Sequence, residues 1–540
     1  MAEINTRSSE PERGAKYANT WMYRSVPIMD EVEDLEDYQP GGLAPLDLGD
    51  NLANRFQIIY KLGFGGMATV WLCWEIDTEQ WRAIKVNAAS QSSEDCSDLL
   101  AIRHMKEQGV TPEQLETNHV VMPLETFWME SPNGRHLCLV LPLLGPNLID
   151  WRSDKLGVDM DRVDKLCYQT AKGLSFLHSK GLCHGDFRPQ NILMKLKPGC
   201  IDHLSRDDVW DVCGFPSTAE VRTATGERSK HAPNEVVGAA PWTLFQDHVI
   251  DEVAIVDFGQ AYKAHEPRKE LGIPAAYASP EVLFDKGQFG VGSDIWSLAT
   301  TLLEVKIDRR ARDSADESIR YMERFIGPVP PYYRQEAKRI LEEHGWDDME
   351  QGPQDFDSTS RTGGAYKAGS TGKLLPLTGP VDIPVSDDEE RDARCKDFAH
   401  PLEMRLGIEQ RAWGLGPDHT DPTGENQTWV RLKYYLPRNE VLGFADLLKR
   451  MYKYKPEERL SASQVLSHRW FEKQRPKQAP ALFPRIPRTF WVAAAAVLFA
   501  SLIWPRRRCV QRFIFGNLLR NWEYVRWAER CKRVVLYVCE

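Results

Sequence analysis

The order of hydrophobic and polar residues separates an early strand-rich region from a later helix-rich one. β-Branched and aromatic residues over 56–62, and a continuous apolar run over 136–141, indicate strands. Apolar residues at helical spacing predict helices over about 95–108, 161–180 and 439–451. A short apolar run that ends at Val256 predicts one more buried strand.

Three segments lack such a pattern. Residues 1–35 predict a flexible N-terminal tail, and a turn-rich lead-in then reaches residue 50. Residues 198–251 are polar and rich in Pro, Gly and Asp, which predicts an insertion that is mostly loop. Residues 351–400 are rich in Gly, Ser, Thr, Pro and Asp, and we expect a disordered second insertion there.

Composition is that of an ordinary globular protein, with 42% hydrophobic and 27% charged residues among 540. The net charge of −10 argues against nucleic acid as a direct partner and is compatible with basic protein substrates. The 11 cysteines include no C-x-x-C pair, which indicates reduced thiols in the cytoplasm or nucleus. No apolar signal-peptide core occurs in the first thirty residues, so secretion is not expected.

The last segment, residues 476–540, has a different character. It holds twelve Lys and Arg against three Glu, and its stretch 489–504 contains no charged residue. Sixteen helical residues reach roughly 24 Å, short of the roughly 30 Å hydrocarbon core of a bilayer. Three interpretations remain open: C-terminal membrane contact through 489–504, a helix docked on the protein, or a poorly ordered tail.

Glycines follow the first predicted strand, at Gly63, Gly65 and Gly66. Such a turn lets backbone N–H groups approach phosphate oxygens that a Cβ would obstruct, although a plain hairpin is the alternative. The next strand carries Lys85 in a V-A-I-K type pattern, whose lysine contacts the α- and β-phosphates of a nucleotide. Together the two features predict a nucleotide site.

Lys85 needs a carboxylate partner from the helix that follows. Asp98 occupies the expected position when Arg103 and Met105 are aligned with the usual kinase pattern. Glu94, one turn earlier, is the other candidate. An acidic helix start that is merely solvated and favoured by the helix dipole is the alternative for either residue.

A second group of polar residues surrounds Asp186, which is followed five residues later by Asn191. In phosphotransferases this spacing supplies an Asp that accepts or orients the proton of the attacking hydroxyl, and an Asn that holds magnesium. Asp257, in an Asp-Phe-Gly triplet after the apolar strand, would be the second magnesium ligand. Because His184-Gly185-Asp186 also occurs in aminoglycoside and choline kinases, this motif alone leaves a small-molecule acceptor open.

Further motifs complete the pattern of a protein kinase. Leu141, Pro142 and Leu144 lie where a buried strand meets a Pro/Gly break, which in kinases is the hinge that faces adenine. Glu281 follows Ser279-Pro280 and is expected to pair with Arg459, because buried Arg–carboxylate pairs brace folds.

With these residues in place, the chain resembles the eukaryotic-type protein kinases, most closely the SR-protein kinase (SRPK) family in its fungal branch. The resemblance runs over about 36–471 and rests on E-D-Y-x-x-G-G at 36–42, Leu-Gly-Asp at 48–50 and G-x-G-x-x-x-T-V-W at 63–71. Like that family, the chain has Ala68 in place of a third glycine, Gly185 in place of an arginine, and an insertion before Asp257.

This resemblance implies an α+β, bilobal protein kinase-like fold, with a small β-rich N-lobe over about 36–144 and a larger α-helical C-lobe over about 145–475. It implies transfer of the γ-phosphoryl group of ATP, with Mg²⁺, to Ser or Thr of protein substrates, Arg/Ser-rich splicing or nuclear proteins among them. The implied catalytic residues are Asp186, Arg188 and Lys85, and the implied metal ligands are Asn191 and Asp257. The implied nucleotide-binding residues are Leu62, Gly63, Gly65, Val70, Ala83, Lys85, Leu141, Pro142 and Leu144.

Departures from the family pattern keep two alternatives in view. Arg188 stands where a lysine is usual, Pro274 where a threonine is usual, and Ala278 where the family has an arginine that shapes its substrate pocket. These changes favour either altered substrate preference or a catalytically weak pseudokinase that acts as a scaffold. A small-molecule kinase is the other alternative, although that class does not require the Asp-Phe-Gly and Ser-Pro-Glu motifs.

Overall fold

The computed structural model describes residues 22–152, 159–206, 208–241, 244–266, 268, 272–284, 289–307, 314–344, 398–408, 410–417 and 427–475. The chain divides into two units, Met1–Gln474 and Arg475–Glu540. The predicted segments 1–21, 351–397 and 476–540, including the apolar stretch 489–504, lie outside the described residues. Within the described part, no helix is long and apolar enough to cross a membrane.

A six-stranded antiparallel sheet in the order β1-β2-β3-β4-β6-β5 forms the first lobe. Its strands are β1 (Asn51–Leu52), β2 (Phe56–Gly65), β3 (Ala68–Glu75), β4 (Gln80–Asn87), β5 (Glu125–Ser131) and β6 (Gly134–Pro142). One face packs a core that includes Phe56, Trp71 and Ile84. Pairing of β4 with β6 sets Ala83 opposite Leu141, so the lysine strand and the predicted hinge are neighbours.

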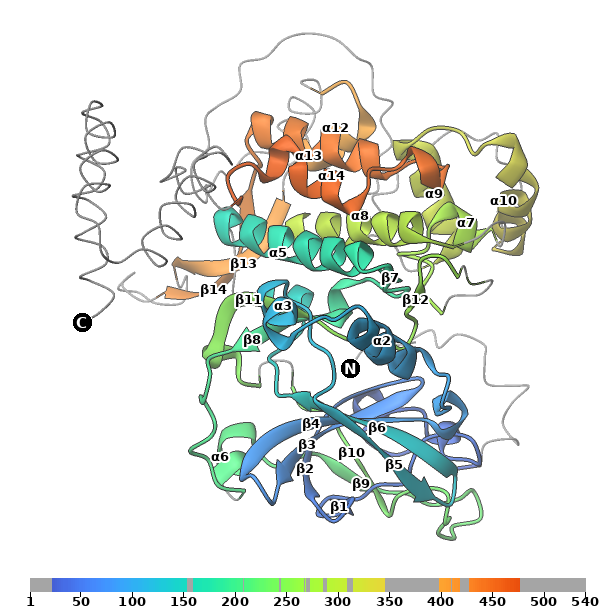
Figure 1. Ribbon diagram of the computed structural model, residues 1–540, viewed down its shortest axis with the longest axis vertical. Helices are drawn as coiled ribbons and strands as arrows, with labels where there is room; N and C mark the ends of the chain where they lie inside the picture. The colour runs from blue at the N-terminus through green and yellow to red at the C-terminus, as the bar shows by residue number, and fades with distance from the viewer. Residues whose placement is uncertain are drawn as a thin grey trace, which may run out of the picture. The chain divides into compact units, whose positions relative to one another are not determined.

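The second lobe is helical, as Figure 1 shows for α5, α8, α13 and α14. The α-helices among the described residues are α2 (Ser97–Glu107), α3 (Pro112–Thr117), α4 (Leu148–Trp151), α5 (Met160–Ser179), α6 (Asp208–Cys213), α7 (Pro280–Leu283), α8 (Val291–Ile307), α9 (Ala315–Phe325), α10 (Pro331–Glu343), α12 (Pro401–Gly407), α13 (Arg438–Met451) and α14 (Ala462–Ser467). Helix α8 is buried almost all round, and its buried residues include the polar Asp294, Glu304 and Lys306 as well as apolar ones. The expected bilobal α+β protein kinase-like fold is confirmed.

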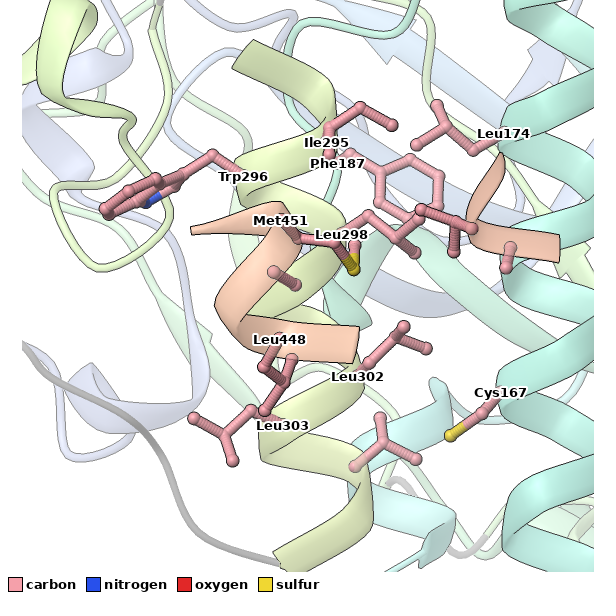
Figure 2. Packing of buried hydrophobic residues seen from close by; sticks show 14 of the residues in the cluster. Cys167, Leu174, Phe187, Ile295, Trp296, Leu298, Leu302, Leu303, Leu448 and Met451 are labelled. Atoms are coloured by element: carbon pink, nitrogen blue, oxygen red, sulfur yellow. The ribbon is translucent and has the colours of Figure 1, made fainter. Parts of the chain in front are cut away.

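The core of the second lobe joins segments that are far apart in the sequence. Figure 2 shows Leu174 of α5 and Leu298 of α8 near Phe187, and Leu302 of α8 and Leu448 of α13 farther along the same cluster. Phe187 is the residue after Asp186 and is 1% exposed. Burial of this ring therefore anchors the loop that carries Asp186 to the helical core.

Two short antiparallel strand pairs bring the polar motifs together. They join β8 (Ile192–Leu196) with β11 (Val249–Ile255), and β7 (Leu182–Cys183) with β12 (Tyr262–Lys263). Ile192 lies opposite Ile255, so the residues just outside this pair, Asn191 and Val256, are also adjacent, and the Val256 N–H donates to the Asn191 carbonyl over 3.0 Å. The loop of Asp186 and the loop of Asp257 consequently lie side by side.

The predicted flexible tail over 1–35 is wrong for residues 22–35. Tyr23, Val26, Val32 and Leu35 are buried in a cluster with Val236 of the first insertion. The apolar residues of this segment are too widely spaced to show a periodic pattern, so the local pattern showed no sign of structure. They are nevertheless buried against a distant segment.

The first insertion, expected to be mostly loop, packs on the first lobe. It contains α6, β9 (Thr218–Glu220) and β10 (Glu235–Val237), and the last two pair as an antiparallel hairpin. Ile201, Val209 and Phe245 pack against Ile59 and Trp81 of the sheet. The remaining strands, β13 (Gln410–Pro417) and β14 (Gln427–Tyr434), form an antiparallel pair.

Candidate active site

Asp186 is held by its own loop in a way that leaves one oxygen free. Its Oδ2 accepts hydrogen bonds from Arg188 Nε over 3.1 Å and from Asn191 Nδ2 over 2.8 Å. Asn191 Nδ2 also donates to the Asp186 carbonyl over 2.8 Å. Asp186 Oδ1 is buried and has no hydrogen-bond partner. An unpartnered buried carboxylate oxygen is unfavourable unless a donor is supplied from outside, as an acceptor hydroxyl would do.

Asp294, a buried carboxylate of α8, holds this loop through hydrogen bonds to its backbone. Asp294 Oδ2 accepts from the His184 N–H over 2.8 Å, and its Oδ1 accepts from the Gly185 N–H over 3.0 Å. Burial raises the pKa of Asp294, but its hydrogen bonds and the histidines His178 and His184 outweigh this and lower the pKa. These bonds join positions 110 and 109 residues apart in the sequence, so they require the tertiary structure.

The position before Asp186, occupied by Gly185, has room only for glycine. Its φ of +80° is in the left-handed region that favours glycine. A Cβ built on it would lie 2.2 Å from the Gln260 carbonyl oxygen. Any other side chain here would displace the segment that follows Asp257.

Lys85 and Asp257 meet across the two lobes. Lys85 Nζ donates to Asp257 Oδ1 over 2.6 Å, although 172 positions separate them in the sequence. Loss of water raises the pKa of Asp257, but the Lys85 ammonium and the Gly259 N–H outweigh it and bring the pKa to about 2. Burial lowers the pKa of Lys85, but the carboxylates of Asp257 and Asp98 raise it above its usual value. Both groups are therefore charged at neutral pH.

Of the two candidate partners of Lys85 on the next helix, the structure places Asp98 at the site and Glu94 away from it. Asp98 is 5% exposed, and its Oδ2 accepts from Asn87 Nδ2 over 3.2 Å. Glu94 pairs instead with Arg135 over 3.2 Å at the surface. Lys85 itself bonds Asp257, so Asp98 acts on it through charge at longer range. The interpretation of Glu94 as the partner is wrong.

Replacing Asp98 by Asn should lower the rate of phosphoryl transfer by about tenfold, because about 1.4 kcal/mol of stabilisation of the Lys85 ammonium would be lost. Glu94→Gln is the matched control and should leave the rate unchanged. Initial rates at saturating ATP measure both variants. Equal rates for the two would contradict the assignment of Asp98.

The glycine-rich strand and the hinge have the features that a nucleotide requires. A Cβ built on Gly63, Gly65 or Gly66 would meet no atom within 4 Å, so the protein's own packing does not demand glycine there. Glycines at such a turn would leave backbone N–H groups open to phosphate oxygens. At the hinge, the Leu144 N–H donates to no acceptor among the described residues, as expected of a group that faces adenine. Leu62, Val70 and Leu141 are partly exposed beside them, and Ala83 is buried.

Two residues offer oxygen ligands suited to magnesium. The Asp257 carboxylate is 39% exposed, and the amide nitrogen of Asn191 is used by Asp186, which leaves the amide oxygen of Asn191 for a cation. Among the described residues, His178, Cys183 and Asp294 form a separate group whose possible ligand atoms lie within 4.8 Å of one another. Because Asp294 is occupied by the loop bonds above, we interpret that group as a brace.

The expected pair between Glu281 and Arg459 is confirmed. The guanidinium donates to both carboxylate oxygens, each over 2.7 Å, and both side chains are almost fully buried. Arg459 also donates to the Gly292 carbonyl over 2.8 Å. The pair thus ties the segment after the Asp-Phe-Gly triplet to the end of the helical lobe.

Comparison with known proteins agrees with this geometry. Residues 56–204 match the protein kinase domain family. SRSF protein kinase 3 of Sus scrofa is 31% identical over 215 residues, which cover 37% of this chain and 38% of that protein. The serine/threonine-protein kinase spk-1 of Caenorhabditis briggsae is 35% identical over 31% of this chain and 15% of its own length. Serine/threonine-protein kinase SRPK of Physarum polycephalum is 28% identical over 56% of this chain and 73% of its own.

The chain has an SRPK-like protein kinase domain. The resemblance to the SRPK family is confirmed, whereas the placement in a fungal branch stays a prediction. The matched part of the chain spans less than two-fifths of the length of the first of these relatives.

Proposed function

We propose that the protein is an ATP- and Mg²⁺-dependent serine/threonine protein kinase. The observation that carries this proposal is the convergence of the free Asp186 Oδ1, the Lys85–Asp257 pair and the Asn191 amide at one place. The pseudokinase alternative is not favoured, because all four residues are present and assembled.

Each of these side chains has a separate role in the proposed reaction. Asp186 Oδ1 accepts the hydrogen bond of the Ser or Thr hydroxyl and receives its proton as the hydroxyl attacks phosphorus. Arg188, held at Asp186 Oδ2, places a positive charge near the transferred group. Lys85 would hold the phosphates of the nucleotide, and Asp257 and Asn191 would hold the cation. When bound, Mg²⁺ neutralises charge that develops on the phosphate oxygens.

Protein acceptors fit better than small molecules. The Glu281–Arg459 brace belongs to the protein kinase pattern, and the similar proteins named above are protein kinases. The relatives' names include SRSF protein kinase and SRPK, so Arg/Ser-rich splicing or nuclear proteins are the finer substrate proposal. Ala278, which is buried and lacks the charge of the family's arginine, argues for a different preference beside the acceptor.

A phosphorylation assay with the purified full chain tests the function. We expect label from the γ-phosphate of ATP to reach Ser and Thr peptides of a library only when Mg²⁺ is present. Aminoglycosides and choline serve as small-molecule acceptors in parallel. Transfer to those acceptors and not to peptides, or no transfer at all, would contradict the proposal.

Activity should not require phosphorylation of the segment between the Asp-Phe-Gly and Ser-Pro-Glu motifs. Residues 257–278 contain no Ser or Thr, and Gly185 removes the arginine that usually binds such a phosphate. Protein expressed in a bacterial host and treated with phosphatase should keep its turnover number. Loss of activity after this treatment, with recovery on addition of an upstream kinase, would refute the prediction.

The location that we propose is the cytoplasm, the nucleus or both. The described cysteines are free thiols, which is compatible with a reducing compartment. Fluorescent tagging of the full chain tests it.

A further inference from the structure

Two accessory segments outside the sheet form hydrogen bonds with the same residue of the glycine-rich strand, Lys61. The first is residues 22–44, and the second is the insertion between β8 and β11. Lys61 lies in β2 immediately before Leu62 and Gly63, and its side chain is 0% exposed. A lysine is almost never fully buried unless its charge is paired.

The segment 22–44 binds the side chain of Lys61. The Lys61 ammonium donates to the Glu33 carboxylate, which is itself 1% exposed. The Tyr38 hydroxyl donates to the other oxygen of Glu33. Burial lowers the pKa of Lys61, and the Glu33 carboxylate opposes this.

The insertion binds the main chain of the same residue. The Ala240 N–H donates to the Lys61 carbonyl over 2.8 Å, and the neighbouring Ala239 N–H donates to the Glu31 carbonyl over 2.8 Å. Strand β1 pairs with β2 at Phe56 and Gln57. Farther along β2, Ala240 supplies to Lys61 the hydrogen bond that a neighbouring strand would otherwise supply. Both accessory segments are thereby joined to each other and to β2 at one point.

Lys61 is in turn linked to the glycine-rich turn. The Lys61 ammonium lies 5.5 Å from the ring centre of Phe64 and 5.3 Å from that of Trp71. The register of β2 with β3 shifts between Lys61 and Gly63, and pairing resumes from Gly63 to Gly65, so Lys61 lies at a local irregularity directly before the glycines. A change in the position of Lys61 would therefore move the residues that face the phosphates.

We propose that the segment 22–44 and the insertion position the glycine-rich strand through Lys61, and that Glu33 is a positioning residue for nucleotide binding. This inference rests on the proposed function, since ATP is the ligand. Without Glu33, the Lys61 ammonium would have to move into water or lose its proton. Either change would remove the bond that fixes Lys61, and with it β2, in position. The effect reaches the nucleotide without any contact between Glu33 and the nucleotide.

Two variants separate positioning from simple stability. Glu33→Gln leaves the Lys61 charge buried without its partner, so both the melting temperature and the ATP affinity should fall. The double variant Glu33→Gln, Lys61→Met leaves no unpaired charge, and its melting temperature should recover. Its ATP affinity should stay about tenfold weaker than that of the wild type, because the charged hydrogen bond that holds the strand is still absent. The KM for peptide should change in neither variant.

The measurements are ATP titration, the KM for peptide, thermal unfolding and amide hydrogen exchange over residues 62–66, all on the full chain. Asp30→Asn, an exposed acid of the same segment, is the control and should match the wild type in each. ATP affinity that recovers together with the melting temperature in the double variant would overturn the positioning role. If the wild type binds no ATP, the proposed function is wrong. The positioning role is then still tested by hydrogen exchange: faster exchange at residues 62–66 in both variants supports it, and unchanged exchange refutes it.

Discussion

Replacing Asp186 by Asn should slow phosphoryl transfer by about 10²- to 10⁴-fold, the usual contribution of a general base. Asn keeps the shape of the side chain and can still bond Arg188 or Asn191 through its oxygen. It cannot take a proton from the acceptor hydroxyl. Because the hydrogen bonds of Asp186 to described residues stay within its own loop, ATP affinity should change little.

Single-turnover rates and ATP titration on the same preparation measure the two effects separately. Asp202→Asn, at an exposed position in the insertion, is the matched control and should behave as the wild type. Near-normal turnover of the Asp186 variant would show that the catalytic assignment is wrong. A large loss of ATP affinity would instead indicate that Asp186 contributes to nucleotide binding.

Replacing Arg459 by Leu should lower the free energy of unfolding by about 3–5 kcal/mol, because the Glu281 carboxylate would stay buried without its partner. The two parallel bonds of 2.7 Å and the bond to the Gly292 carbonyl are all lost at once. The double variant Glu281→Leu, Arg459→Leu should recover most of the loss, since it leaves no buried charge.

Urea unfolding measures these free energies, and Arg450→Ala is a control because Arg450 pairs with Asp446 at the surface. Burial raises the pKa of Glu281, but Arg459 outweighs it and lowers the pKa below its usual value of 4.5. The unfolded chain therefore binds this proton more tightly, and the stabilisation is present above about pH 4.5 and lost as the pH falls further. Single variants as stable as the wild type would contradict a bracing role.

Local sequence determined the parts of the site that lie within one loop or one strand. Asp186 and Asn191 are five positions apart, so their hydrogen bond follows from the conformation of a single loop. Lys85 and the hinge residue Leu141 were located by strand patterns, and the sheet register then set Ala83 beside Leu141. Helix periodicity placed α5 and α13 within one or two residues of their observed bounds. These features depend on short-range backbone geometry, which a sequence pattern reports directly.

Tertiary structure alone decided which distant groups meet. Sequence placed Asp98 at the expected position but left Glu94 open as the other candidate, because their separation of four residues puts both near the same helix end. Only packing of α2 buries Asp98 and leaves Glu94 to pair with Arg135. Glu33 was assigned to a flexible tail, since a few dispersed apolar residues carry no periodic signal, yet it is buried against Lys61. Such contacts form only when segments far apart in the chain are buried against one another, and a local sequence pattern does not report which segments meet.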